Sequence, residues 1–264
     1  MNDPGFTQSG PIILALDTSS KETSLAISRG NEALHSFAAQ SDEKRSEKLW
    51  IDIRALLDEA GIAIDDVELF GVCVGPGGFT GLRVGIAAAK GLAAATGKPL
   101  AGITSLEASA FLASRAAPVC AMIKAYKGEV YSQLFELDER GGPVALSAPV
   151  VSTSIQAIER VADLESVTFV GDGAIDNAEA IRELAGDRFR GAEATERSSV
   201  GWRIKVASEP VAERVAGLAY LKMIRGETDT AESLQACYVR PAEAEIKLSQ
   251  GLLGSKVRRS MKAE

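Results

Sequence analysis

The stretch IILALDTSSKETSLAISRGNEALHSFAAQ, residues 12–40, decides the fold class. It contains three short apolar runs, at 12–18, 23–29 and 33–40, and a polar turn separates each run from the next. Consecutive short strands joined by tight turns are typical of an antiparallel meander. We therefore expect a β-sheet whose first three strands are antiparallel.

Helices and strands alternate after this meander. Apolar side chains at helical spacing predict a helix at 44–60, and Gly61 supplies its end. We expect a strand, a helix and a further strand at 69–75, 81–97 and 99–104. The first half of the chain then has the order strand, strand, strand, helix, strand, helix.

The second half repeats that order. Three strands, a helix, a strand and a helix are expected at 118–125, 128–137, 144–152, 154–164, 167–171 and 176–186. A repeated order of elements predicts an α/β fold made of two similar lobes that face each other across a cleft.

The pattern also predicts how the chain is divided. Residues 187–207 are polar and read as a connection, and Ser208 as an N-cap with Pro210 in the first turn predicts a helix that ends at Gly226. The expected parts are a flexible tail at 1–11, a first lobe from 12–115 and 208–226, a second lobe at 116–207, a region with a last strand (237–241) at 227–250, and a basic tail at 251–264. The basic tail is either a solvated end or a contact to tRNA or a partner.

Composition limits the classes of function. The 264 residues are 46% hydrophobic and 25% charged, which suffices for a large buried core. A net charge of −7 argues against binding nucleic acid over a broad surface through counterion release. Three separate cysteines, an N-terminus unlike a signal peptide, and the lack of an apolar run of about 18 residues lead us to expect a cytoplasmic protein without a membrane span.

A glycine turn follows the strand at 69–75 and raises the question of nucleotide binding. It lacks the lysine and hydroxyl of a P-loop, and it lacks the third glycine and the acid of a dinucleotide fingerprint. A strand, glycine turn and helix can still present amide groups to an anion, or the glycines can simply permit a tight turn. The candidates for nucleotide contact are Gly75, Pro76, Gly77, Gly78 and Thr80.

The helix after this turn carries a stripe of small side chains. Small residues in a row let another backbone approach closely, either within the lobe or at a subunit interface. We assign a partner interface to this helix and take Arg83 as the residue that hydrogen-bonds a partner or a nucleotide held between subunits, with a surface ion pair as its alternative. The predicted interface residues are Gly81, Arg83, Gly85, Ala88, Ala89 and Ala93.

Few residues offer metal or nucleophile chemistry. His35 is the only histidine, so a pair of histidine ligands and a Ser-His-Asp triad are both excluded within this chain, and we predict no metal site. Asp17 ends the first strand beside Thr18 and Ser19. These three residues either form a vestigial phosphate or metal site, in which the acid orients a magnesium ion or a water, or belong to a turn that the Asp17 side chain caps.

Several segments together resemble one family. They are ILALDTSSKETSLAI (13–27), the glycine turn with its helix and the following strand (72–108), KGEVYSQLFE (127–136) and CYVRP (237–241). Over about residues 12–245 the chain resembles the TsaB (YeaZ) family of the bacterial threonylcarbamoyladenosine pathway.

The resemblance implies two RNase H-like lobes of the actin-like ATPase fold. It also implies a non-catalytic subunit that pairs with a TsaD-like transferase and a TsaE-like ATPase. These transfer a threonylcarbamoyl group to N6 of adenosine 37 in tRNAs that read codons beginning with A. The family implies a homodimer when the chain is alone, formed through first-lobe helices, and contact with tRNA only through the complex. ATP or ADP at the joint interface with TsaD is left open.

The chain departs from the pattern of catalytic relatives. Where TsaD-like paralogues have metal-binding histidines, SDEKRSEKLW (41–50) has none. The second-lobe turn VGDGAIDN (170–177) offers Asp172 or Asp176 but lacks the doubled glycines of an adenosine-binding turn. We therefore predict no catalytic residue.

Two other classes remain as alternatives. An independent ATPase or kinase of the actin-like superfamily would use Asp17 and an acid of the second lobe. An M22-type metalloprotease is disfavoured, because His35 is the only histidine.

Overall fold

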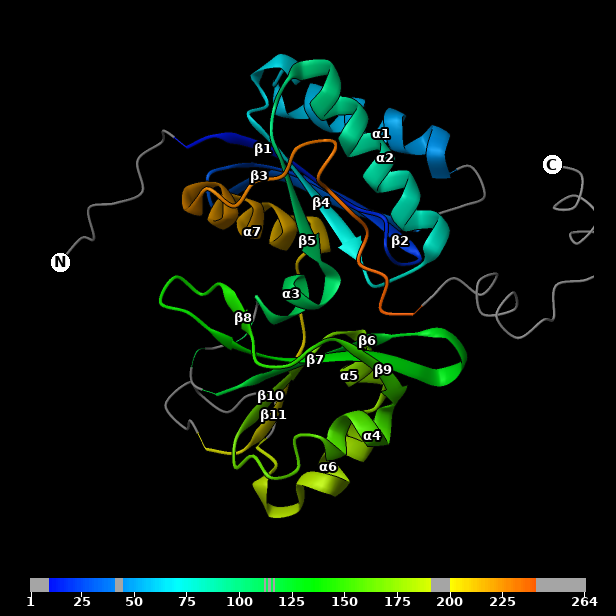
Figure 1. Ribbon diagram of the computed structural model, residues 1–264, viewed down its shortest axis with the longest axis vertical. Coiled ribbons are helices and arrows are strands. Elements are labelled where there is room, and N and C mark those ends of the chain that lie inside the picture. The colour runs from blue at the N-terminus through cyan, green and yellow to red at the C-terminus, as the bar shows by residue number, and fades with distance from the viewer. Residues whose placement is uncertain are drawn as a thin grey trace, which may run out of the picture.

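The computed structural model describes residues 10–40, 45–111, 113, 115, 117–190 and 200–240. These residues form two lobes, each built on its own β-sheet, and a short helix between the sheets joins them (Figure 1). The α/β class and the two-lobed architecture predicted from the sequence are confirmed.

The first sheet has the strand order β3-β2-β1-β4-β5. Its strands are β1 (Ile12–Asp17), β2 (Glu22–Arg29), β3 (Glu32–Gln40), β4 (Leu69–Gly75) and β5 (Leu100–Thr104). The first three are antiparallel, as the meander predicted, while β4 and β5 run parallel to β1. The central strand β1 ends at Asp17, which pairs with Ser24 on β2.

Helices cover both faces of this sheet. On one face, α1 (Arg45–Ala60) and α2 (Phe79–Thr96) pack over Leu14 and Leu16, and a 3-10 turn, η1 (Ile64–Asp66), lies between β4 and α1 in sequence. On the other face, α7 (Val211–Arg225) packs over Ile13 and Ala15 (Figure 1). Alternate side chains of a strand point to opposite faces, so one short apolar strand supplies both layers of the core.

The second sheet repeats the topology, in the order β11-β10-β6-β7-β8 with β9 also paired to β7. Its strands are β6 (Val119–Lys124), β7 (Glu129–Leu137), β8 (Pro143–Ala145), β9 (Val150–Thr153), β10 (Val167–Val170) and β11 (Trp202–Lys205). The helices are α3 (Ser105–Ala110), α4 (Ser154–Glu159), α5 (Asp172–Asp176) and α6 (Ala178–Ala185), with 3-10 turns η2 (Tyr126–Gly128) and η3 (Gly186–Arg188). As in the first lobe, the first strand is antiparallel to the second and parallel to the strand after the helix.

Some boundaries differ from those expected. The single strand predicted at 144–152 is two strands, because residues 146–149, which include Pro149, interrupt the pairing. The helix predicted at 176–186 breaks at Asn177, whose side-chain amide donates to the carbonyl of Gly173.

The connection predicted at 187–207 contains a strand, β11, which extends the second sheet beside β10. Its Trp202 is fully buried. The helix after it is capped at Pro210 and not at Ser208, and no side chain supplies a cap hydrogen bond there.

The two lobes share apolar contacts through α3. Leu106 and Ala110 of this helix pack with Phe135 and Val170 of the second sheet. The lobes are therefore connected by a packed interface as well as by the chain itself.

Both ends of the chain lie largely outside the described residues. Of the tail expected at 1–11, only Gly10 and Pro11 are described, and the carbonyl of Pro11 accepts a hydrogen bond from Gly30 at 2.9 Å. The basic tail at 251–264 lies outside them entirely. In the described part of the chain, no helix combines the length and the apolar character that crossing a bilayer requires.

Candidate functional site

The glycine turn between β4 and α2 is packed against two other segments. Gly75 has φ +106°, and a side chain there would place its Cβ 2.9 Å from the carbonyl oxygen of Cys237. A Cβ on Gly77 would lie 2.5 Å from the carbonyl oxygen of Ser19. These glycines therefore permit a backbone conformation and a close approach that larger residues would prevent.

Backbone polar groups of the turn that a ligand would need are already hydrogen-bonded within the protein. The amide of Gly78 donates to the carbonyl of Ser19 at 2.6 Å, and the hydroxyl of Ser105 donates to the carbonyl of Pro76 at 2.5 Å. Of the five predicted contact residues, Gly78 and Thr80 are exposed. The tight-turn interpretation has direct support, while nucleotide contact stays a prediction.

The small-residue stripe of α2 faces the interior of the first lobe. Gly81, Gly85, Ala88, Ala89 and Ala93 are all buried. The hydroxyl of Thr18 donates to the carbonyl of Gly81 at 2.7 Å, and a Cβ on Gly85 would collide with that hydroxyl.

The prediction that these five residues form a partner interface is therefore wrong. Their small size lets α2 lie close to the end of β1, which is the internal alternative considered from the sequence. Arg83 is the one member of the predicted interface that is exposed.

The outer faces of α1 and α2 carry apolar and small side chains that were not predicted from the sequence. On α1, Trp50 is 49% exposed and Ile51 is 67% exposed. On α2, the exposed positions beyond Arg83 are Ala87, Gly91, Ala94 and Ala95. The available signal was the helical wheel, because Trp50 and Ile51 lie outside the apolar face that includes Leu49 and Ile53.

Arg83 belongs to an aromatic cluster at the start of α2. Its guanidinium carbon lies 3.8 Å from the ring centroid of Phe79, and its Nε donates to the Tyr238 hydroxyl at 3.5 Å. The rings of Phe79 and Tyr238 are 5.6 Å apart. Stacking holds the guanidinium in place and leaves its edge available to an acidic group.

Asp17 lies at the end of β1 and is 2% exposed. Its Oδ1 accepts a hydrogen bond from the amide of Ser19 at 2.9 Å, so the capping role considered for this acid is observed. Thr18 and Ser19 are also buried. These three residues lie close together, as expected from the sequence.

A buried arginine lies on the side of the sheet that Asp17 faces. Arg214, in the first turn of α7, is 9% exposed; its Nη1 donates to the carbonyl of Ala108 at 3.3 Å and its Nε has no hydrogen-bond partner. Burial lowers the pKa of Arg214, and the charge of Asp17 is the strongest influence that raises it. Cys73 packs on the same face, and burial, with the charge of Asp17, raises its pKa well above the usual value.

The second lobe has a lysine where the first lobe has Asp17. Lys124 ends β6 as Asp17 ends β1, in strands of equivalent topology. The Lys124 ammonium pairs with Asp176 at 2.7 Å, and the Lys124 amide donates to Asp172 at 2.9 Å. Asp172 and Asp176 were the candidates from the sequence for the second acid of a nucleotide site, and both are therefore bonded to Lys124.

This arrangement does not fit a magnesium nucleotide between the lobes. Such a site needs oxygen donors that are free to approach the ion. Asp17 is buried with a guanidinium in its surroundings, and its counterpart is a cation. Among the described residues no three His, Cys, Asp or Glu side chains are grouped so that they could hold a metal ion, and His35 is exposed on β3.

Two sheets of repeated topology, each covered by helices, define a two-lobed α/β protein. More particularly, the chain belongs to the TsaD family, described as tRNA N6-adenosine threonylcarbamoyltransferase, whose model matches residues 39–242.

Individual relatives agree with this assignment. The chain is 33% identical over 132 residues to the tRNA threonylcarbamoyladenosine biosynthesis protein TsaB of Escherichia coli, covering 49% of this chain and 57% of that protein. It is 37% identical over 111 residues to a tRNA N6-adenosine threonylcarbamoyltransferase of Clostridium botulinum, covering 36% of this chain and 33% of the relative. The alignments thus span between a third and somewhat over half of these curated relatives.

A solved structure shares the whole architecture. YeaZ from Pseudomonas aeruginosa superposes with a TM-score of 0.68 at 29% identity, covering 86% of this chain and 99% of that one. The resemblance to TsaB (YeaZ) that was predicted from sequence motifs is confirmed.

Proposed function

We propose that this chain is a partner subunit in tRNA threonylcarbamoyladenosine biosynthesis. It binds a TsaD-type transferase, holds that enzyme in an active form together with a TsaE-type ATPase, and supplies no reacting group itself. The similarity to TsaB supports the pathway, and the bonds of Lys124 to Asp172 and Asp176, together with the burial of Asp17, support a role without chemistry.

The observation that carries the proposal is the outer surface of α1 and α2. A half-exposed tryptophan and a largely exposed isoleucine lie on α1, and exposed alanine and glycine positions on α2 let another backbone come close. Exposed apolar groups of this kind mark protein interaction sites, and tryptophan and arginine are the residues that most often dominate binding energy there. The transferase is the occupant that the family assignment favours.

The same surface accounts for the remaining parts of the proposal. When the chain is alone, it forms a homodimer through the outer surface of α1 and α2. The homodimer and the complex with the transferase therefore exclude each other. The stacked Arg83 contributes a charged hydrogen bond to the partner, or to ATP or ADP held at the joint interface. A net charge of −7 supports contact with tRNA only through the complex.

The test is reconstitution of the modification from tRNA, threonylcarbamoyl-adenylate and a TsaD-type transferase, with and without this chain. Product formation should depend on the chain. Product that forms at the same rate without it would overturn the proposed role.

A pair of variants locates the surface. Ala87→Arg places a long charged side chain on the outer face of α2, and we expect at least a tenfold loss of transferase affinity. Ala148→Arg makes the same change at an exposed position of the second lobe and should leave affinity unchanged. Equal affinities for the two folded variants would show that the partner docks elsewhere.

A further inference from the structure

The segment 227–240, which follows α7, is here called the strap, and it includes most of the CYVRP motif. It begins against the first sheet, where Asp229 forms an antiparallel bridge with Leu100. Leu234 is buried in the core of the first lobe, and the amide of Cys237 donates to the carbonyl of Val74 at 2.8 Å. The strand expected at 237–241 does not form in the part of it that the structure describes; the strap instead runs as an irregular segment from the start of β5, at Leu100, to the end of β4, at Val74 (Figure 1).

The end of the strap contacts two different parts of the molecule. Tyr238 stacks on Phe79 and accepts the hydrogen bond from Arg83, at the start of α2. Two residues later, Arg240 Nη1 lies 2.6 Å from Glu129 Oε2, at the start of β7 in the second lobe. These side chains are 36% and 30% exposed, so the ion pair is partly protected from solvent.

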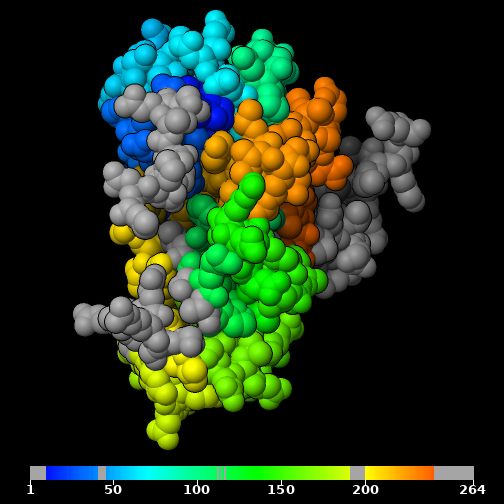
Figure 2. Space-filling model, turned by 90° about the vertical axis from the view of Figure 1, so that its left-hand side faces the viewer, coloured from blue at the N-terminus to red at the C-terminus, as the bar shows by residue number. Residues whose placement is uncertain are grey.

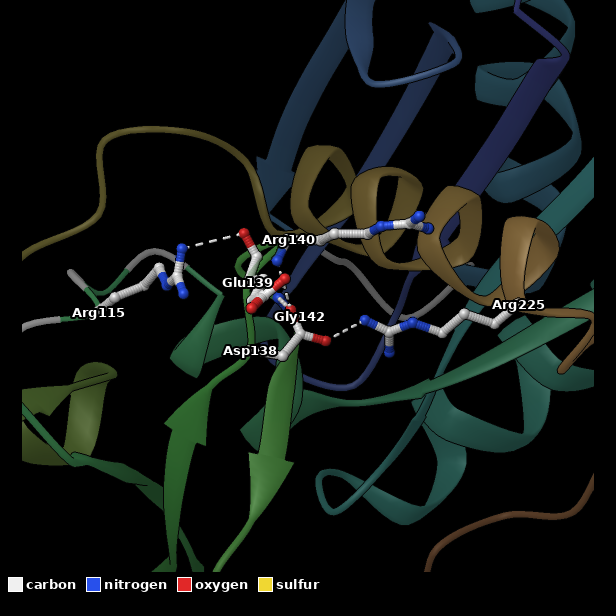
Figure 3. A network of polar contacts seen from close by, with 6 residues as sticks. All are labelled: Arg115, Asp138, Glu139, Arg140, Gly142 and Arg225. Atoms are coloured by element: carbon white, nitrogen blue, oxygen red, sulfur yellow. Dashed lines mark hydrogen bonds and ion pairs between the residues drawn. The ribbon is translucent and has the colours of Figure 1, made fainter.

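The other end of β7 is held separately. Asp138, just after β7, forms an ion pair with Arg225 in the last turn of α7, and its Oδ1 accepts 2.8 Å hydrogen bonds from the amides of Arg140 and Gly142 (Figure 3). In Figure 2 this part of the second lobe (green) lies against the end of α7 (orange). The stretch from Arg225 to Arg240 thus ties both ends of one second-lobe strand to the first lobe.

We propose that the strap couples the docking surface on α2 to the second lobe. Tyr238 is the positioning residue for Arg83, and the pair of Arg240 with Glu129 fixes Tyr238 in place. Loss of that pair frees the end of the strap and, with it, the Arg83 side chain that the partner must immobilise. This inference rests on the proposed docking of a transferase at α2.

The cost of immobilising a freed arginine predicts the size of the effect. Ordering one long side chain weakens binding by about three- to tenfold. Glu129→Gln and Arg240→Gln should each reduce transferase affinity by that factor, although neither changes the outer faces of α1 and α2. Asp138→Asn removes the ion pair at the other end of β7 and is the matched control, expected to leave affinity unchanged.

A second measurement needs no partner. Cys237 lies in the strap beside Tyr238 and is only partly buried, whereas Cys73 and Cys120 are buried. In the free protein, Glu129→Gln and Arg240→Gln should raise the rate at which a thiol reagent modifies Cys237 at least threefold, and Asp138→Asn should not. The charge-swapped double variant Glu129→Arg/Arg240→Glu should restore the slow rate.

The outcomes separate this inference from the proposed function. Wild-type protein that fails to bind the transferase defeats the proposed function, and the coupling to docking fails with it. An unchanged Cys237 rate in both single variants overturns the role of the Arg240 pair, and so does an equal increase in Asp138→Asn. A faster Cys237 with undiminished affinity shows that the strap is fixed by the pair but does not position Arg83.

Discussion

Asp17 and Arg214 place opposite charges in a region from which water is almost excluded, since they are 2% and 9% exposed. Removing one charge leaves the other buried without compensation, which is costly, whereas removing both relieves the desolvation of each. Arg214→Met should therefore lower the free energy of unfolding, and Asp17→Asn should partly offset that loss. We expect a coupling of about 1–3 kcal/mol in a double-mutant cycle measured by urea denaturation.

The control cycle combines Asp17→Asn with Arg54→Met, because Arg54 is exposed on α1 and should be additive with Asp17. Additivity in the Arg214 cycle as well would show that the two buried charges do not stabilise each other.

This pair also shows what sequence reveals about single residues. The capping role of Asp17 was considered because its partner lies two positions away, and local hydrogen bonds follow from residue type. Arg214 approaches Asp17 only because α7 returns to the first sheet from the far end of the chain. No local pattern around Arg214 signals that it is buried.

At the scale of the element, two of the three glycines of α2 have sharply different surroundings. A Cβ on Gly85 would collide with the Thr18 hydroxyl, while a Cβ on Gly91 meets nothing within 4 Å. Gly85→Ala should lower the free energy of unfolding by about 1–3 kcal/mol through overpacking. Gly91→Ala should raise it by about 0.5–1 kcal/mol, because alanine is the better helix former.

Thermal unfolding of the two variants checks this. A stabilised Gly85→Ala would mean that the small face of α2 does not pack against β1. A destabilised Gly91→Ala would mean that the outer face is covered.

Periodicity located α2 but could not tell its inner face from its outer one. Small residues recur at helical spacing on both faces of α2, so the sequence did not show which face packs against the sheet. The side that faces the sheet is set by the close contact of Gly81 and Gly85 with Thr18, and this contact exists only in the folded lobe. The inner face of α1 was located correctly, because Leu49, Ile53, Leu56 and Leu57 recur at helical spacing and are buried together.

At the scale of the whole molecule, the repeated order of strands and helices was sufficient to predict two similar lobes. Apolar strands and their turns are local features, so their order is visible in the sequence. The strap was not predicted, because its position depends on side chains that contact separate elements. Tyr238 contacts Arg83 on α2, and Arg240 pairs with Glu129 on β7. Such contacts between lobes carry no local periodicity.

The ion pair between Asp138 and Arg225 makes the contact between lobes dependent on pH. Burial would raise the pKa of Asp138, but hydrogen bonds from the amides of Gly142 and Arg140, together with the charge of Arg225, outweigh it and lower the pKa below its usual 3.8. A carboxyl group whose pKa is lowered by folding stabilises the protein fully above its ordinary pKa, and that stabilisation is lost as pH falls through the lowered value.

Asp138→Asn should therefore lower the free energy of unfolding by about 1 kcal/mol at pH 7, a modest value because both side chains are partly exposed to solvent. The difference from wild type should stay constant at neutral and weakly acidic pH, shrink as the pH falls below the ordinary value of 3.8, and disappear once the pH is below the lowered pKa of Asp138. Glu139→Gln, an exposed position on the same turn, should show little difference at any pH. A loss in Asp138→Asn that persists undiminished in acid would mean that the charge of Asp138 does not hold the second lobe against α7.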